Sequence, residues 1–251
     1  MSNILTTHVG SLPRSKELSE FLFAKDKGEK FSQSSFDEVL KNNVASVVKK
    51  QLDVGIDFVS DGEMSKISYA TYIKDRIEGF SGESERRAPA DLDDFPEYKE
   101  KIAKSGGTPT YTRPCCTNEL KVKDETSLQK DINNFKNSLD KLNHRHAFMN
   151  SASPGVINVF MPNKFYSTED EYLDKLSNIM AKEYEVITKS DIQVQLDCPD
   201  LALARHMNFK NLSEDEFIKR AELQIECLNS ALSNVDIEQT RMHICWGNYE
   251  G

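Results

Sequence analysis

The chain has 251 residues, a formal net charge of −9 and 38% hydrophobic residues. This length suffices for one large α/β domain, and the acidic balance argues against nucleic-acid or anionic-membrane partners, which require clustered Lys and Arg. No apolar run reaches the roughly 18 residues of a membrane span and the first residues do not resemble a signal peptide, so we expect a cytoplasmic protein with a small-molecule partner.

The first predicted elements form a strand, a helix and a second strand. Segment 4–9 is expected to be a strand. Apolar residues at spacings of three and four then predict a helix over 36–52. A short buried strand at 56–60 follows, and its carboxyl end leads directly to Asp61 and Glu63. The segment therefore has the alternating order that is typical of α/β proteins.

Residues 81–110 interrupt this rhythm. They contain polar, acidic and Gly-Pro-rich turn sequences in place of a regular apolar period. We interpret them as a surface excursion or lid within one domain that spans 1–251. A further strand is expected near 111–116.

The helix-to-strand order then repeats. The expected helices cover 128–142, 168–189 and 213–233. The strands that follow them cover 146–150, 192–197 and the segment that carries His243 and Cys245. About six strand-plus-helix units result, which predicts an α/β fold with a parallel sheet. A (β/α)8 TIM-type barrel truncated after about the sixth unit fits this pattern. A doubly wound open sheet is the alternative, although no nucleotide-binding glycine loop is present.

Acidic residues follow two of the predicted strands. In a (β/α)8 barrel, the carboxyl ends of the strands form the catalytic face. Gln193, Gln195 and Asp197 share one strand face, where buried polar groups are costly unless they bind something or satisfy one another. Asp61 and Glu63 also suit a helix cap or a turn, so a purely structural role stays open for them.

His243 and Cys245 form a His-x-Cys pair on the last predicted strand. Alternate residues of a strand point to the same face, so an imidazole and a thiol would lie together, and both are good zinc ligands. Zinc needs four ligands, or three and an exchangeable position, and the pair supplies only two. A packed histidine and a small buried cysteine are the alternative reading. The five cysteines show no C-x-x-C spacing and are expected to be free thiols.

Four of these stretches together resemble the catalytic (β/α)8 barrel of the cobalamin-independent methionine synthase family, in its short single-barrel branch. They are Thr6–Arg14, Gly55–Glu63, Val194–Pro199 and His243–Asn248. They follow the family's order along nearly the whole chain. Uroporphyrinogen decarboxylase is a wider relative that shares the barrel but has no zinc.

The resemblance implies zinc-dependent methyl transfer from a methyltetrahydrofolate-type donor to the thiolate of homocysteine, which gives methionine. His243 and Cys245 match two of the zinc ligands. Glu63 and Asp197 match the acidic residues that hold the substrate's ammonium, and the turn Gly10, Ser11 matches the one that receives its carboxylate. The family's other zinc ligands, a Glu and a second Cys, lie on later strands, as does a His linked to proton delivery. None of these residues is matched in this chain, so the catalytic residues stay unassigned and the chain alone is expected to be inactive or impaired.

Three other functions stay open at this point. Short relatives alkylate other thiols, as a coenzyme M transferase does. A non-catalytic assembly protein would retain the half-site and cover its open sheet edge by forming a homo-oligomer. A uroporphyrinogen-decarboxylase-like enzyme would leave His243 and Cys245 without a metal.

Overall fold

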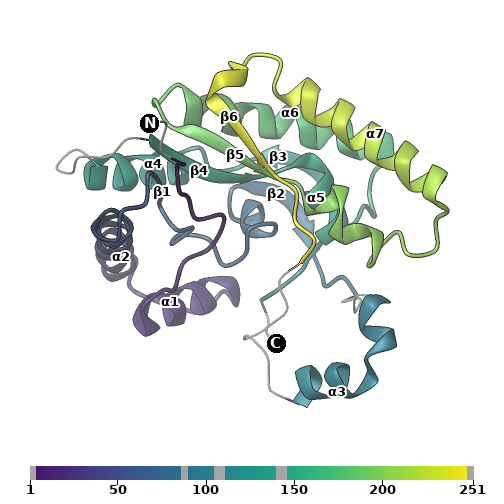
Figure 1. The fold of residues 1–251 in the computed structure, drawn as a ribbon, viewed down its shortest axis with the longest axis horizontal. Coiled ribbons are helices and arrows are strands. Elements are labelled where there is room, and N and C mark those ends of the chain that lie inside the picture. The colour runs from purple at the N-terminus through teal and green to yellow at the C-terminus, as the bar shows by residue number, and fades with distance from the viewer. Residues whose placement is uncertain (1–3, 86–89, 105–110, 140–145, 248–251) are drawn as a thin grey trace.

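The computed structural model describes residues 4–85, 90–104, 111–139 and 146–247 (Figure 1). Its main sheet has four strands in the order β1-β4-β5-β6. They are β1 (Phe58–Ser60), β4 (His146–Ala152), β5 (Gln193–Asp197) and β6 (Thr240–His243). All of their pairings are parallel. The predicted α/β fold with a parallel sheet is confirmed.

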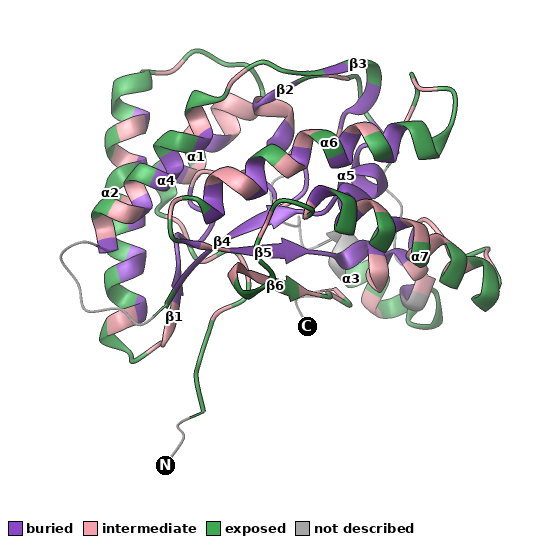
Figure 2. Ribbon diagram, turned by 90° about the horizontal axis from the view of Figure 1, so that it is seen from above, coloured by how far each residue is buried: buried purple, intermediate pink, exposed green. Residues whose placement is uncertain are grey.

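Two helices precede the first strand of this sheet, and the others lie in the connections between its strands. The α-helices are α1 (Lys16–Asp26), α2 (Gln33–Asp53), α3 (Pro96–Lys104), α4 (Thr126–Leu139), α5 (Pro154–Phe160), α6 (Glu169–Thr188) and α7 (Glu214–Ala231). Short 3-10 helices are η1 (Tyr72–Asp75), η2 (Ala90–Asp94), η3 (Pro199–Leu201), η4 (Leu203–Arg205) and η5 (Ile237–Gln239). Helices α2, α4 and α6 lie on one side of the sheet, and α7 packs on α6 (Figure 2).

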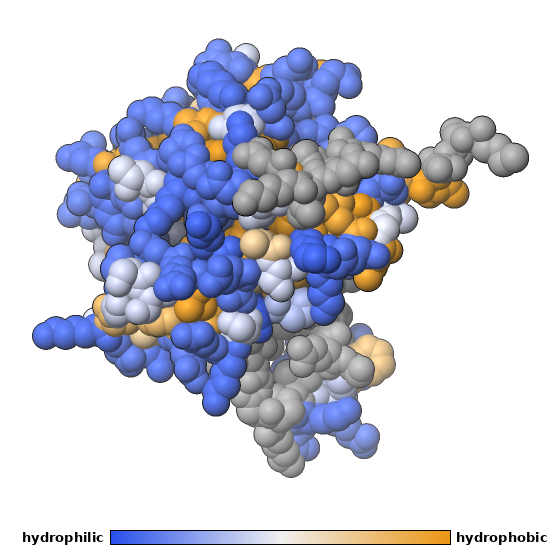
Figure 3. All heavy atoms as spheres, turned by 90° about the vertical axis from the view of Figure 1, so that its left-hand side faces the viewer, coloured by the Kyte–Doolittle hydropathy of each residue, from blue (hydrophilic) through white to orange (hydrophobic). Residues whose placement is uncertain are grey.

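The core lies between the main sheet and these helices. Its largest fully buried side chains include Tyr184 and Tyr172 of α6, Phe135 of α4 and Phe148 of β4. On the side of the molecule that carries α1 and α2, the surface is largely hydrophilic (Figure 3). Helices α2, α4 and α6 thus each bury one apolar face and leave a polar face in solvent, as their spacing predicted.

Capping explains why two predicted helices match the structure closely. The Thr168 hydroxyl accepts a hydrogen bond from the amide of Glu171 (3.1 Å) at the start of α6. Ser213 and Glu216 form a reciprocal capping box at the start of α7. Each cap satisfies amide groups that the first helical turn leaves without a partner. The predicted helices over 168–189 and 213–233 are confirmed to within two residues at each end.

The strand predicted over 4–9 is wrong. The structure has a single parallel bridge there, between Thr7 and Phe58. Two residues later, the carbonyl of Val9 accepts hydrogen bonds from the side-chain amides of Asn150 (3.0 Å) and Gln195 (2.7 Å). These side chains take the place of a neighbouring strand, so the ladder cannot continue.

The strand predicted near 111–116 does not join the parallel sheet. It runs as β3 (Cys115–Val122) and pairs antiparallel with β2 (Ile77–Ser81) in a second sheet. The register shifts at Gly79, whose φ is +105° and whose missing Cβ would stand 2.8 Å from two carbonyl oxygens of β3. An antiparallel pair can leave one face in solvent, which suits β3, where Cys115, Cys116 and Leu120 are buried and the other side chains are exposed.

The described part of segment 81–110 contains η2 and α3, which lie apart from both sheets in Figure 1. The amide of Ala90 donates to the carbonyl of His206 (2.8 Å) and links this segment to the main body. Its role as a lid stays a prediction. Among the helices of the described ranges, none combines the length and apolar character that crossing a membrane requires.

Candidate active site

All six residues predicted for the site line one cavity. It has a volume of about 400 Å³ and lies at the carboxyl ends of β1, β5 and β6. The six are Gly10, Ser11, Glu63, Asp197, His243 and Cys245. Tyr69 and Pro199 complete much of the wall. Segments that are far apart in the chain therefore meet here, and the chemical role of each residue stays a prediction.

A tight turn after β1 places Glu63. Gly62 and Glu63 both have left-handed backbone conformations, with φ of 65° and 55°. A Cβ at Gly62 would stand 3.1 Å from Cβ of Leu12, so the turn needs glycine there. The Asp61 carboxylate accepts from the amide of Glu63 (3.0 Å), and the Arg14 guanidinium donates to the carbonyl of Glu63 (2.8 Å). Backbone strain at a non-glycine residue is thus held by contacts on both sides.

The Glu63 carboxylate is 1% exposed, and its Oε2 has no hydrogen-bond partner among the described residues. Burial raises the pKa of Glu63 to about 7, and the nearby carboxylates of Asp197 and Asp61 act in the same direction. The cations of Lys66 and Arg14 oppose this rise. An unpartnered buried acceptor beside a cavity is suited to a donor that arrives with a ligand.

Asp197 ends β5 with both carboxylate oxygens held by amides. Oδ2 accepts from Asn150 (3.0 Å) and Oδ1 accepts from Gln195 (2.9 Å). Burial raises the pKa of Asp197, while these hydrogen bonds and the positive charge of Lys66 reduce the rise. The polar side chains predicted on one face of this strand therefore meet part of their hydrogen-bonding requirement with one another. Gln193 differs, because its side chain donates to the carbonyl of Glu238 (3.0 Å).

His243 and Cys245 both reach the cavity wall, but β6 ends at His243 and so does not carry both. The carbonyl of His243 accepts from the amide of Cys198 (2.8 Å), and the carbonyl of Cys245 accepts from the amide of Leu203 (3.1 Å). Beyond the end of β6, the backbone therefore continues to accept hydrogen bonds from the segment that follows β5. This continuation lets the i and i+2 side chains line the same cavity, as the His-x-Cys spacing predicted.

Zinc would find two donors of suitable chemistry here, an imidazole and a thiol. In the ranges that the structure describes, no group of three or more His, Cys, Asp or Glu side chains could hold a metal ion. The pair thus has the ligand chemistry that zinc prefers but supplies fewer ligands than zinc requires.

Sequence patterns did not reveal Lys66 and Asn150. Lys66 is 3% exposed and donates to the carbonyl of Asn150. Asn150 ends the predicted strand 146–150, and its position at a strand end could have marked it as it marked Asp197. Lys66 gives no such signal, because the surrounding loop shows no period that predicts burial.

A family model described as "Cobalamin-independent synthase, Catalytic domain" matches residues 4–105. The methionine synthases of Sulfolobus acidocaldarius and Pyrococcus furiosus are each 24% identical to the chain, over 245 and 246 residues. These matches cover 97% of the chain and 62% of each relative, so the chain spans less than two thirds of their length.

Solved structures of similar proteins agree in fold. A B12-independent methionine synthase from Shewanella sp. W3-18-1, in complex with selenomethionine, superposes with a TM-score of 0.68 at 17% identity. The alignment covers 96% of the chain and 61% of that protein. A putative vitamin-B12 independent methionine synthase from Listeria monocytogenes gives a TM-score of 0.65 at 14% identity, over 99% of the chain and 68% of its own. The chain thus resembles the catalytic domain of the cobalamin-independent methionine synthases, in sequence over residues 4–105 and in fold over most of its length.

Proposed function

We propose that the cavity binds homocysteine, and the product methionine, in zinc-dependent transfer of a methyl group from a methyltetrahydrofolate-type donor. The observation that carries the proposal is the meeting of two buried carboxylates, a small-residue turn and a His-Cys pair around one cavity of about 400 Å³. Each of the three suits a different group of the same amino-acid thiol. Because His243 and Cys245 supply only two of the ligands that zinc needs, we expect methyl transfer by this chain alone to be absent or impaired.

The ammonium group of the substrate is assigned to Glu63 and Asp197. Both carboxylates are buried, and burial raises the pKa of each. A bound ammonium would add a positive charge next to these carboxylates and so favour their ionised form. It would also donate a hydrogen bond to the unpartnered Oε2 of Glu63. The ion pair is strong in such a site because little water is available to screen it.

The carboxylate of the substrate is assigned to the turn Gly10, Ser11. The turn lies on the same wall, and a Cβ added to Gly10 would stand 3.5 Å from Oε1 of Glu63. Glycine therefore keeps the backbone close to the acidic group without covering it. Exposed backbone N–H groups in such a turn suit an anion.

The thiol is assigned to the end of the cavity formed by His243 and Cys245, which would hold zinc by two of its positions. When bound, zinc lowers the pKa of a coordinated thiol and so supplies a thiolate at neutral pH. Glu63 and Asp197 fix the amino-acid end, which limits where the sulfur can lie. The same assignment favours the cytoplasm, where thiols remain reduced.

We also propose that the parallel sheet is part of a (β/α)8 barrel, and that a second copy of the chain covers its edge strand β6. The TM-score of 0.68 over 96% of the chain supports the barrel. The position of β6 at the end of the strand order supports an edge that needs covering.

Isothermal titration calorimetry with L-methionine tests the substrate class. Glu63→Gln and Asp197→Asn should each weaken binding by about tenfold or more, because each removes a charge-assisted hydrogen bond. Asp53→Asn is the matched control, since Asp53 lies on α2 and pairs with exposed Lys49. Unchanged affinity in both site variants would refute the ammonium assignment. Binding of coenzyme M in preference to methionine would favour the other thiol transferase.

A further inference from the structure

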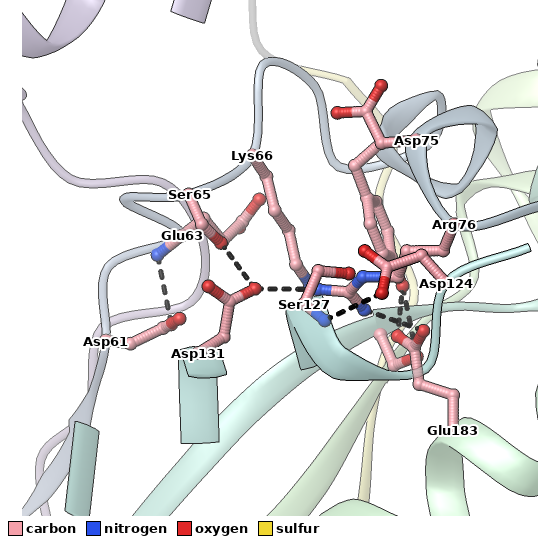
Figure 4. Close-up of polar contacts among 12 residues, drawn as sticks. Asp61, Glu63, Ser65, Lys66, Asp75, Arg76, Asp124, Ser127, Asp131 and Glu183 are labelled. Carbon is pink, nitrogen blue, oxygen red and sulfur yellow. Dashed lines mark hydrogen bonds and ion pairs between the residues drawn. The ribbon is translucent and has the colours of Figure 1, made fainter. Parts of the chain in front are cut away.

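Lys66 is a buried cation that lies close in the chain to Glu63, a residue of the candidate cavity (Figure 4). Its Nζ donates to the carbonyl of Asn150 and lies 4.1 Å from the centre of the Tyr72 ring. Its amide donates to the carbonyl of Glu63 (3.0 Å), and Arg14 donates to the carbonyls of both residues (2.8 Å each). Lys66 is thus held on the same turn as Glu63.

Three buried carboxylates surround this part of the fold. Asp61, Glu63 and Asp197 are 3%, 1% and 5% exposed. Burial raises the pKa of each, and the positive charge of Lys66 opposes the rise in all three. Arg14 opposes it for Asp61 and Glu63 from the other side of the turn. Burying several like charges requires such a compensating charge.

A second cation accounts for the acids on the far side of Lys66. Arg76 pairs with Asp131 of α4 (2.7 Å) and with Glu183 of α6 (2.8 Å). Tyr72 and Ser151 also donate to Glu183. Figure 4 shows this cluster next to Lys66. Arg76 thus pairs directly with Asp131 and Glu183, whereas the positive charge of Lys66 acts on the cavity acids as well as on Glu183.

A chain of hydrogen bonds joins Lys66 to the end of β5. Lys66 donates to the carbonyl of Asn150, and the side-chain amide of Asn150 donates to Oδ2 of Asp197 (3.0 Å). The same amide also donates to the carbonyl of Val9 (3.0 Å). The lysine therefore restrains the residue that orients Asp197, in addition to acting through its charge.

We propose that Lys66 is a positioning residue of the cavity. Its ammonium fixes Asn150 against Asp197 and supplies a buried positive charge beside Glu63, and it thereby sets the pH range in which the cavity accepts an ammonium ligand. The statement about the ligand rests on the proposed function. The statement about the two carboxylates does not.

Carbon-13 NMR of the side-chain carboxyl groups of the full chain tests the proposal without any ligand. The Glu63 signal is assigned by its loss in Glu63→Gln. Lys66→Met keeps most of the side-chain volume and removes the charge, and it should move the titration midpoint of Glu63 upward by about one pH unit or more. Lys66→Arg should restore the midpoint. An unchanged midpoint in Lys66→Met would overturn the proposal.

Methionine binding across pH separates a charge effect from structural damage. Below the titration midpoint of Glu63 in the wild type, the Lys66→Met variant should bind methionine about tenfold more weakly than the wild type, because a larger fraction of its Glu63 is protonated. Above the titration midpoint of Glu63 in the variant, Glu63 is ionised in both proteins. The variant's affinity for methionine should then equal or exceed that of the wild type, because the variant lacks a cation next to the ligand's ammonium. Equal weakening at every pH would contradict the charge mechanism.

Two controls complete this experiment. Lys49→Met removes an exposed lysine that pairs with Asp53 on α2, and it should leave both midpoint and affinity unchanged. Lys66→Gln, which retains a donor for the carbonyl of Asn150, serves if Lys66→Met does not fold. A wild-type chain that binds no methionine at any pH would end the proposed function, and the NMR titration would still decide the role of Lys66.

Discussion

Asp197 and His243 are register partners on the neighbouring parallel strands β5 and β6. A carboxylate assigned to the ammonium group therefore lies next to a histidine assigned to the metal. The positive charge that His243 can carry reduces the rise that burial causes in the pKa of Asp197. An amino-acid thiol that anchors at Asp197 can thus present its sulfur to the neighbouring strand. This relationship links the amino-acid end of the cavity to its thiol end.

Methionine should bind more tightly as the pH rises through about 7. Burial, together with Asp197 and Asp61, raises the pKa of Glu63 to about 7, so the empty site holds a neutral Glu63 below that value and an ionised one above it. Only the ionised form attracts an ammonium group fully. Calorimetric titrations between pH 5.5 and 8.5 check this expectation. In Glu63→Gln the step near neutral pH should vanish, and its persistence would assign it to another group.

The same carboxylate should cost the empty protein stability at high pH. The pKa of Glu63 is raised in the folded state from 4.5 to about 7, so its favourable contribution is complete below the unfolded value and is lost as the pH rises through 7. Glu63→Gln should therefore gain about 2 kcal/mol over the wild type between pH 5 and pH 8.5. Urea unfolding at both pH values measures this gain, and Asp53→Asn is the control. A pH-independent difference would contradict the linkage.

Removing the charge of Arg76 should destabilise the fold strongly. The guanidinium pairs with two buried carboxylates, and Arg76→Met would leave both without their cation. Loss of one partner from a buried pair costs about 3–5 kcal/mol. Thermal and urea unfolding at pH 7 report the loss. Lys49→Met, which breaks an exposed pair, should lose less than about 1 kcal/mol.

The loss of stability caused by Arg76→Met should also become smaller at acidic pH. Burial would raise the pKa of Glu183, but Arg76 and Lys66, together with the hydrogen bonds from Tyr72 and Ser151, outweigh burial and hold that pKa below its ordinary value. The stability that Glu183 contributes in the wild type is therefore present above its unfolded pKa and is lost as the pH falls. The variant lacks that contribution, so the two curves should converge towards about pH 4. If the stabilities of the wild type and the variant instead differed by the same amount at every pH, the loss would come from packing.

Cobalt binding should reveal the His-Cys pair. Co²⁺ replaces Zn²⁺ at sites of this chemistry, and a thiolate ligand gives it a charge-transfer absorption in the near ultraviolet. The wild-type chain should show this band, and Cys245→Ser should lose it, while His243→Ala should weaken the affinity by about tenfold or more. Cys227→Ser is the control, because Cys227 lies on α7 and outside the cavity wall. Loss of the band in Cys227→Ser instead would place the metal elsewhere.

Local patterns predicted those elements whose two faces differ. The helices α6 and α7 each have a capped start and an apolar stripe, so spacing alone revealed them. Helix α5 was missed because every one of its residues is buried, which leaves no alternation to detect. The pairing of β2 with β3 depends on a register shift at Gly79, and a single sequence does not encode its partner strand.

The candidate site was predictable where a polar residue ends a strand. Asp197 and His243 follow this rule, and Glu63 lies in the turn directly after β1, because parallel strands bring their carboxyl ends together. Lys66 does not follow it, since its position depends on Asn150 and Tyr72, which come from distant parts of the chain. Its burial is therefore a property of tertiary packing that the sequence around it does not signal.

The hydrogen bond from Gln195 to the carbonyl of Val9 spans 186 residues of chain. A ribosome must therefore deliver most of the polypeptide before the wall around Gly10 and Ser11 can close. Contacts of such long sequence separation form slowly, because the intervening chain loses much freedom when its ends meet. Partly folded chains would carry helices α1 and α2 long before they could hold a ligand. Ligand binding during refolding should thus appear as a late event, after most helical structure has formed.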